Sequence, residues 1–276
     1  MSLTTTRTLN NGTKIPAIGL GVYKVEAGDE AYQSVKSALE IGYRHIDTAS
    51  FYANEEDVGK AIKDSGIPRE DIFVTTKVWN DEQGYEEAKA AIDRSLDRLG
   101  MEYVDLYLIH WPVPGKFTET WKALEEIYQS GKAKAIGVSN FLPHHLEELL
   151  QAAETKPMVN QIELHPQLQQ DETRTFCQEH NILIEAWAPL GKASYFDHPV
   201  LQELAEKHQK TPAQIIVRWQ YQSGIITIPK SVHKHRQEEN VDIFDFELET
   251  EDMDKMTGMN EEKRLGKHPD EFDYGV

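Results

Sequence analysis

The stretch Tyr43-Arg44-His45-Ile46-Asp47 can form a short buried strand, and it ends in a carboxylate. Segments of helical period lie between this stretch and others like it. Tyr32, Val35 and Leu39, for example, recur at three- and four-residue spacing. Strands that alternate with helices predict a parallel sheet. The other short apolar or β-branched stretches are Ile18–Gly21, Phe73–Lys77, Val104–His110, Ala135–Ser139, Val159–Glu163, Leu183–Ala186 and Ile225–Pro229.

The spacing of these stretches favours one of two architectures. Markers near the strand ends are Asp47, Lys77, His110, Asn140, Gln161, Trp187 and Lys230, at steps of 30, 33, 30, 21, 26 and 43 residues. Eight βα units of about 30 residues predict an α/β protein of the (β/α)8 TIM-barrel class. The alternative, an open doubly wound sheet, needs a glycine-rich turn after the first strand. Gly19-Leu20-Gly21-Val22-Tyr23-Lys24 lacks the third glycine of that turn.

Two regions lie outside this regular pattern. Thr6–Leu9 and Thr13–Ile15 flank Asn10-Asn11-Gly12, a turn signal, and predict an N-terminal β-hairpin. The long last step contains two helical stretches, Pro199–His208 and Pro212–Gln222, so one of them is an insertion and we expect one or two extra helices in all.

Composition and charge exclude several classes of partner. The chain of 276 residues has no linker, which predicts a single domain over 1–276 with a loop from about residue 261 over the active-site end. A net charge of −18 argues against binding to nucleic acid or an anionic membrane. Cys177, the one cysteine, fits a reducing compartment. The polar N-terminus and the lack of a long apolar run predict a cytoplasmic protein.

Four residues near three neighbouring strand ends have a coherent chemistry. They are Asp47, Lys77 and His110, with Tyr52 five residues after Asp47. Catalytic residues of (β/α)8 barrels lie at the carboxyl ends of strands. A lysine ammonium lowers the pKa of a nearby tyrosine hydroxyl, a carboxylate keeps the lysine charged, and an imidazole can orient a carbonyl oxygen. The set therefore predicts a site that polarises and protonates a C=O group.

Each member also has an alternative explanation. Buried Asp–Lys pairs are common structural features, a loop tyrosine usually packs, and His110 could be a core residue. Lys77 could also form a Schiff base in a lyase. Asp47 close to Lys77 argues against that reaction, because it favours the charged, non-nucleophilic ammonium.

Longer motifs around these residues resemble the aldo-keto reductase family. The first signature is resembled by Gly42-Tyr43-Arg44-His45-Ile46-Asp47-Thr48-Ala49 with Tyr52 and Asn54-Glu55. Two segments resemble the second signature: Leu106-Tyr107-Leu108-Ile109-His110-Trp111-Pro112 and Gly137-Val138-Ser139-Asn140-Phe141. One segment resembles the third signature: Ile228-Pro229-Lys230-Ser231-Val232 with Arg236. The motifs occur in order along essentially the whole chain. The short tail resembles the compact bacterial branch that includes 2,5-diketo-gluconate and methylglyoxal (glyoxal) reductases.

The resemblance implies a barrel with an N-terminal hairpin that transfers hydride between NADPH and an aldehyde, a ketone or an α-dicarbonyl. It implies that Tyr52 is the general acid, that Lys77 and Asp47 support it, and that His110 orients the carbonyl. We expect an open pocket for a small carbonyl substrate, and a monomer, as is common in the family. The alternative from another class is a non-catalytic sensor that binds NADPH and signals to a partner.

One segment has an unusual charge for so acidic a chain. Residues 230–236 contain three Lys/Arg, two His and no carboxylate. Just after a barrel strand, such a cluster can bind a phosphate, although two glutamates that follow could simply offset it at a helix start. The resemblance implies that Lys230, Ser231 and Arg236 bind the adenosine 2′-phosphate, which favours NADPH over NADH.

The resemblance assigns further residues to the cofactor and the substrate. For the cofactor it implies Glu239 and Asn240 at the adenine, Ser139, Asn140 and Gln161 at the nicotinamide carboxamide, and Trp187 under the nicotinamide ring. It adds Gly21, Val22, Tyr23, Asp47, Ala188, Leu190 and Val232. For the substrate it implies Tyr23, Phe51, Trp79, His110 and Trp111, although aromatic residues beside strands usually pack.

No pattern of metal ligands is recognisable. The pairs His144-His145 and His233/His235 have no cysteine or acidic partner in a ligand pattern. The sequence therefore predicts no metal site.

Overall fold

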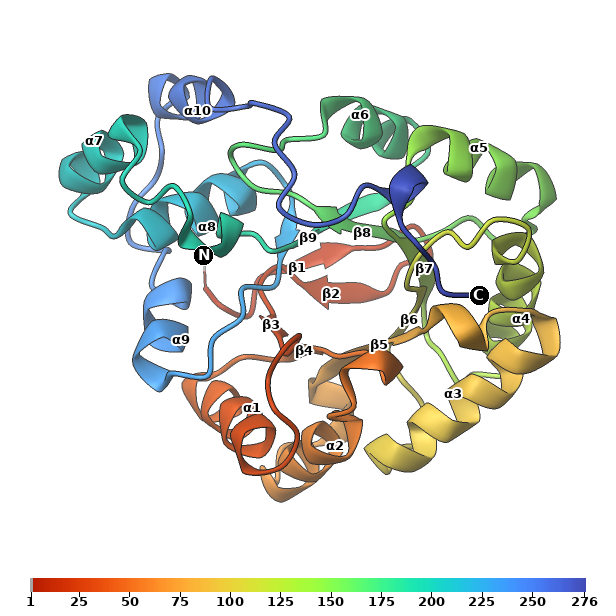
Figure 1. Ribbon diagram of the computed structural model, residues 1–276. Helices are drawn as coiled ribbons and strands as arrows, with labels where there is room; N and C mark the ends of the chain where they lie inside the picture. The colour runs from red at the N-terminus through yellow and green to blue at the C-terminus, as the bar shows by residue number, and fades with distance from the viewer. Residues whose placement is uncertain (1) are drawn as a thin grey trace.

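Eight parallel strands form a closed barrel in the computed structural model, which describes residues 2–276 (Figure 1). Each strand pairs with the next, and a bridge between Ile18 and Thr227 joins the first strand to the last. At this seam the Gly19 amide donates to the Thr227 carbonyl at 2.9 Å. The predicted (β/α)8 barrel is confirmed. The strands are β3 (Leu20–Gly21), β4 (His45–Asp47), β5 (Phe73–Val78), β6 (Leu106–Ile109), β7 (Ile136–Ser139), β8 (Val159–Glu163), β9 (Leu183–Trp187) and β10 (Ile226–Thr227).

Helices surround the barrel, and most of them bury an apolar face (Figure 1). They are α1 (Asp29–Ile41), α2 (Glu55–Asp64), α3 (Tyr85–Leu99), α4 (Phe117–Gln129), α5 (Pro143–Ala152), α6 (Asp171–Glu179), α7 (Pro199–His208), α8 (Pro212–Gln222), α9 (Lys234–Val241) and α10 (Thr250–Thr257). The two predicted helices of the last step are α7 and α8. Helix α8 packs against β10, whereas α7 packs against α8 and α10. None of these helices, across residues 2–276, has the length and apolar character to cross a bilayer.

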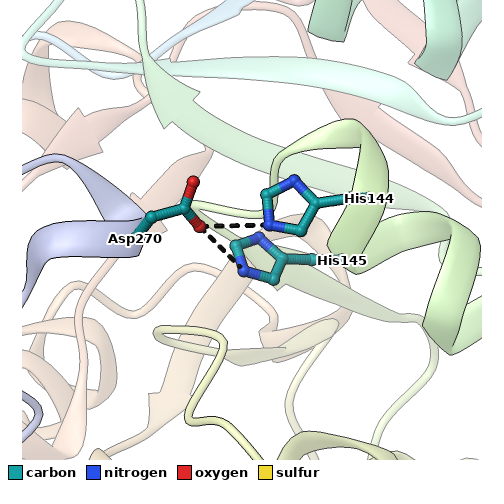
Figure 2. Close-up of side chains that lie close together, drawn as sticks. All are labelled: His144, His145 and Asp270. Atoms are coloured by element: carbon teal, nitrogen blue, oxygen red, sulfur yellow. Dashed lines mark hydrogen bonds and ion pairs between the residues drawn. The ribbon is translucent and has the colours of Figure 1, made fainter.

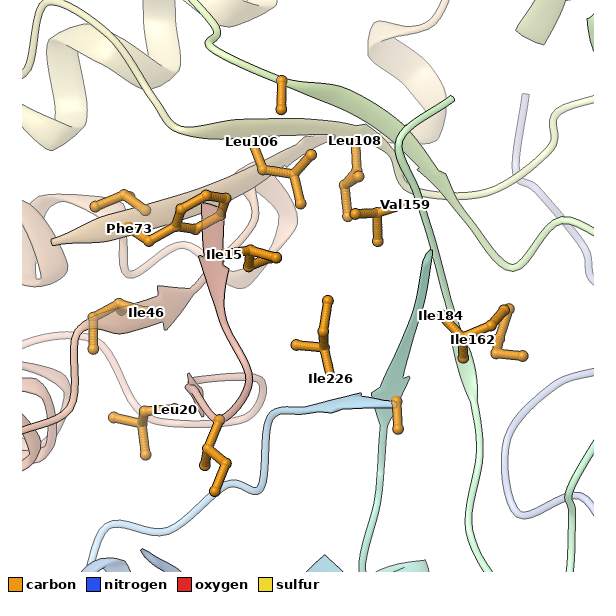
Figure 3. Packing of buried hydrophobic residues seen from close by; sticks show 14 of the residues in the cluster. Ile15, Leu20, Ile46, Phe73, Leu106, Leu108, Val159, Ile162, Ile184 and Ile226 are labelled. Carbon is orange, nitrogen blue, oxygen red and sulfur yellow. The ribbon is translucent and has the colours of Figure 1, made fainter. Parts of the chain in front are cut away.

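The predicted hairpin, β1 (Thr6–Thr8) and β2 (Lys14–Pro16), closes the amino-terminal end of the barrel. Its turn is held by the side chain of Asn10, whose Nδ2 donates to the carbonyls of Pro157 and Asn181, just before β8 and β9. Ile15 on β2 is fully buried and lies among core side chains of the barrel (Figure 3). The hairpin therefore acts as an apolar plug at this end.

The C-terminal segment after α10 crosses the opposite end of the barrel (Figure 1). The backbone amides of Leu265 and Gly266 donate to Glu163, the last residue of β8. Farther along, the Tyr274 carbonyl accepts from Asn80, just after β5. The segment has one short 3₁₀ turn, η5 (Pro269–Glu271). It therefore lies over the strand ends where the predicted catalytic residues are found.

We predict that Ile15→Ala lowers the free energy of unfolding by about 2–5 kcal/mol, because it leaves a cavity under the barrel. Urea denaturation measures this change. Lys14→Ala, on the same strand but exposed, is the matched control and should differ little from wild type. Equal stability of the Ile15→Ala variant and the control would show that the plug contributes nothing.

Candidate active site

The side chain of Lys77 is the centre of a compact polar site at the carboxyl end of β5. Its ammonium donates to Asp47 Oδ1 at 2.7 Å, to the Thr48 carbonyl at 2.9 Å and to Tyr52 Oη at 3.3 Å. These three acceptors match the three protons of an ammonium. Lys77 is fully buried, so the three bonds replace the water that burial has removed.

Tyr52 reaches this centre from a 3₁₀ turn, η1 (Ser50–Tyr52), which follows β4. The Ser50 hydroxyl donates to the Lys77 carbonyl at 3.1 Å and ties the turn to β5. The ring of His110, after β6, meets the Tyr52 ring edge-on at a centroid distance of 5.6 Å. The structure therefore brings all four predicted catalytic residues together. Because Tyr52 Oη accepts a hydrogen bond from Lys77, the hydroxyl hydrogen of Tyr52 remains free to donate to another group.

The electrostatics differ from the sequence-based expectation at Tyr52. Burial raises the pKa of Tyr52 to about 12, although the charge of Lys77 acts in the opposite direction. The charge of Lys77 does favour a lower pKa for Tyr52, as predicted, but burial outweighs it and the net shift is upward. Burial lowers the pKa of Lys77, but the charge and hydrogen bond of Asp47 outweigh it, so the net shift is upward. The site therefore contains a neutral phenol beside a charged ammonium.

His110 is neutral for a related reason. Burial, with a contribution from the charge of Lys77, lowers the pKa of His110 well below its ordinary value. Its Nδ1 atom is buried and has no hydrogen-bond partner within residues 2–276. A neutral imidazole has one N–H donor, which can bind a carbonyl oxygen without adding a second positive charge beside Lys77.

A second carboxyl group lies behind this centre, and sequence reasoning missed it. Gln161 Nε2 donates to Asp47 Oδ2 and to Glu185 Oε2, each at 2.8 Å. Burial and the nearby charge of Asp47 raise the pKa of Glu185 to about 8. His45 Nε2 is 3.5 Å from Glu185 Oε1, but burial lowers the pKa of His45 to about 3, so this contact is not an ion pair at neutral pH. Glu185 could have been noticed in the sequence, because it is a glutamate within the otherwise apolar strand β9.

The residues assigned to the nicotinamide form a chain of hydrogen bonds across three strand ends. Trp187 Nε1 donates to Asn140 Oδ1 at 2.8 Å, and Asn140 Nδ2 donates to the His110 carbonyl at 3.0 Å. Ser139 Oγ donates to the Gln161 carbonyl at 2.8 Å. Asn140 has a left-handed backbone (φ +64°), which turns its side chain between its two neighbours. Asn140 therefore links the backbone of His110 to the Trp187 indole.

The basic cluster lies apart from the predicted catalytic residues, in the loop after β10 and the first turn of α9. Lys230 and Arg236 are exposed, and neither forms an ion pair with any residue from 2 to 276. Ser231 Oγ accepts from the His233 amide at 3.1 Å, so the turn is ordered by its own hydrogen bond. Lys234, in contrast, lies 3.4 Å from Glu40. The two cations assigned to a phosphate are therefore available to bind one.

The other assigned cofactor residues surround the same end of the barrel. A Cβ atom on Gly21 would lie 2.8 Å from the Ile228 carbonyl, so a larger residue would separate β3 from the last strand. Glu239 accepts a hydrogen bond from Thr211 Oγ1 at 2.7 Å, and Asn240 is buried. The remaining residues follow strand ends: Val22 and Tyr23 after β3, Ala188 and Leu190 after β9, and Val232 after β10.

Aromatic rings lie beside the four predicted catalytic residues. Phe51 stacks on Trp79 at a centroid distance of 3.8 Å, and Trp79 meets His110 edge-on at 4.9 Å. Trp111 stacks on Phe272 of the C-terminal segment at 4.3 Å, a contact that the sequence did not predict. A cavity of about 810 Å³ lies beside Phe51 and Trp79, but none of the four catalytic candidates lines it.

A second polar cluster joins α5 to the C-terminal segment (Figure 2). The Nε2 atoms of His144 and His145 lie 3.1 and 3.3 Å from Asp270 Oδ1. The assumption that this histidine pair has no acidic partner was therefore wrong, because the partner is distant in sequence. His145 Nδ1 accepts from the Leu142 amide at 3.1 Å, so the proton of a neutral ring is on Nε2, facing Asp270. A metal at Nε2 would need that proton moved, so this arrangement favours a hydrogen-bonded clamp.

We predict that Glu185→Gln stabilises the fold more at pH 8 than at pH 5. Between about 4.5, the ordinary pKa, and about 8, the folded protein holds a proton on Glu185 that the unfolded chain has released. The wild-type free energy of unfolding therefore falls as pH rises through this window, and the variant lacks this loss. Urea denaturation from pH 5 to pH 8 measures the difference, with the exposed Glu179→Gln as control. Parallel curves for Glu185→Gln and wild type would contradict the assignment.

Known proteins resemble this chain over almost its whole length. A model of the Aldo/keto reductase family matches residues 17–261. Glyoxal reductase of Bacillus subtilis (strain 168) is 56% identical over 271 residues, or 98% of each chain. Methylglyoxal reductase DkgA of Escherichia coli (strain K12) is 44% identical over 268 residues, or 96% of each. A solved structure of a Gox0644 mutant in complex with NADPH, 45% identical, has a TM-score of 0.94 and covers 98% of this chain and 99% of that one. The predicted resemblance is confirmed, and the chain belongs to the aldo/keto reductase family.

Proposed function

We propose that this protein is an NADPH-dependent oxidoreductase that reduces aldehydes, ketones and α-dicarbonyl compounds, such as methylglyoxal, to alcohols. The observation that carries the proposal is the convergence of a neutral phenol, a buried ammonium and a neutral imidazole on one point. The glyoxal and methylglyoxal reductases among its relatives support the substrate class.

The four catalytic residues have distinct roles in this proposal. Bound NADPH supplies the hydride for the carbonyl carbon. Tyr52 gives its proton to the carbonyl oxygen, and His110 donates an N–H hydrogen bond that holds that oxygen in place. Lys77 is already 3.3 Å from Tyr52 Oη, so it stabilises the phenolate that remains. Asp47 keeps Lys77 charged and oriented.

Features of the described residues fit the cofactor. Lys230 and Arg236 are unpaired cations beside an ordered turn and can hold a 2′-phosphate. The Trp187 indole is fixed by its hydrogen bond to Asn140 and offers a flat surface for the nicotinamide ring. Ser139, Asn140 and Gln161 offer amide and hydroxyl groups to the carboxamide. NADPH bound there would extend from the basic cluster to the catalytic residues.

The alternative functions are less well supported. A Schiff-base lyase needs a neutral Lys77, but its raised pKa and its three acceptors favour the ammonium. A non-catalytic sensor would not need all four catalytic residues in contact. The expectation of a cytoplasmic monomer with one domain over residues 1–276 stays a prediction.

We predict that Tyr52→Phe lowers kcat for methylglyoxal reduction by about 10²- to 10⁴-fold, because the proton donor is lost. Its affinity for NADPH should be unchanged, since the hydroxyl is not a cofactor ligand in this proposal. Stopped-flow loss of NADPH absorbance gives the rate, and fluorescence titration gives the affinity. Equal rates in the two proteins would remove Tyr52 as the general acid.

We predict that Arg236→Ala weakens NADPH binding by about tenfold or more, the effect of one charge-assisted hydrogen bond. Binding of NADH, which has no 2′-phosphate, should change little. Lys234→Ala is the matched control, because Lys234 belongs to the same cluster but pairs with Glu40. An equal loss for NADPH and NADH would place the 2′-phosphate elsewhere.

A further inference from the structure

Glu163 is a buried carboxylate that the catalytic proposal does not use. Its Oε1 accepts the Leu265 amide at 2.7 Å, and its Oε2 accepts the Gly266 amide at 3.0 Å. His165 Nε2 lies 3.2 Å from Oε1. Glu163 ends β8, so a strand of the barrel binds the backbone of the C-terminal segment directly.

These hydrogen bonds keep the carboxylate charged. Burial raises the pKa of Glu163, but the hydrogen bonds from His165 and from the Leu265 and Gly266 amides outweigh it, so the net shift is downward. Hydrogen bonds to a charged acceptor are stronger than neutral ones. An ionised Glu163 therefore holds this part of the C-terminal segment firmly. Lys192 Nζ adds a bond to the Leu265 carbonyl at 2.9 Å.

The segment held in this way touches the Trp187 indole. A Cβ atom on Gly266 would collide with Cη2 of Trp187 and would lie 2.9 Å from Glu163 Oε2. Only glycine fits between the two side chains. The contact falls on the benzene edge of the indole, and Nε1 on the other edge donates to Asn140. Trp187 is thus fixed on both edges, by Asn140 and by the Gly266 backbone.

We propose that Glu163 is a positioning residue for the cofactor. By binding the amides of Leu265 and Gly266, it presses the C-terminal segment against Trp187 and sets the plane on which the nicotinamide stacks. This inference rests on the proposed function. It adds that the nicotinamide surface depends on a carboxylate that touches neither substrate nor cofactor.

The test compares the affinities of the protein for two ligands, one with a nicotinamide and one without. In Glu163→Gln, the side-chain NH₂ group faces one of the two backbone N–H groups and cannot accept a hydrogen bond from it. The segment therefore loses one of its two anchoring bonds. We expect the Kd for NADPH to rise about tenfold, the effect of one lost charge-assisted hydrogen bond. The Kd for adenosine 2′,5′-bisphosphate, which has no nicotinamide, should stay within twofold of wild type. General damage to the protein would weaken both ligands.

A second readout follows the segment itself. Trypsin can cut after Lys263 and Lys267, which are exposed on either side of the anchored residues. We expect faster cleavage there in Glu163→Gln than in wild type. The exposed Glu271→Gln, in the same segment, is the matched control and should behave as wild type. Gly266→Ala keeps the carboxylate but displaces Trp187, so it should also weaken NADPH and not the bisphosphate. If Glu163→Gln fails to fold, Gly266→Ala still tests whether the segment positions Trp187 for the cofactor.

The outcomes separate this inference from the proposed function. An unchanged NADPH affinity in either variant, or an equal loss for NADPH and the bisphosphate, would overturn the positioning role while wild-type methylglyoxal reduction stands. A wild-type protein that binds no NADPH would overturn both proposals. Selective loss of NADPH affinity in both variants, with the control unchanged, supports the role of Glu163.

Discussion

The buried ammonium of Lys77 is the constraint on which the site depends. A charge removed from water needs partners, and here all three come from one neighbouring strand and the turn after it: Asp47, Thr48 and Tyr52. The parallel pairing of β4 with β5 brings these groups to the same height in the barrel. The ammonium therefore fixes where the phenol lies, and through the Tyr52 ring it also fixes the space left for His110.

The barrel interior changes character along its axis. At the amino-terminal end it contains apolar side chains and is closed by Ile15 of the hairpin (Figure 3). Toward the carboxyl end it becomes polar, where Asp47 binds Lys77 through one oxygen and Gln161 through the other. Gln161 extends the network to Glu185 on the next strand. Stability and chemistry are thus placed at opposite ends of one sheet, which is the usual division in this architecture.

Sequence reasoning could predict what depends on local pattern. Strand and helix periodicity gave the barrel, and the strand-end positions of Asp47 and Lys77 followed from it. Contacts between distant segments were not predictable: Asp270 meets His144 across 126 residues, and Leu265 meets Glu163 across 102. The direction of the Tyr52 pKa shift also needed the structure, because burial competes with the charge of Lys77 and only the fold decides how deep the hydroxyl lies.

Glu163 binds the C-terminal segment through backbone amides, so these hydrogen bonds depend on the course of the backbone and hardly on its side chains. Gly266 is the exception, because no other residue fits beside Trp187. Residues farther along, such as Phe272 on Trp111, can therefore be exchanged without loosening the anchor. Under the proposed function, variation in this stretch reshapes a wall of the substrate site and leaves Tyr52 and Lys77 in place. That separation would, under the proposed function, make the tail a suitable segment to exchange between relatives when the choice of carbonyl substrate is to be altered.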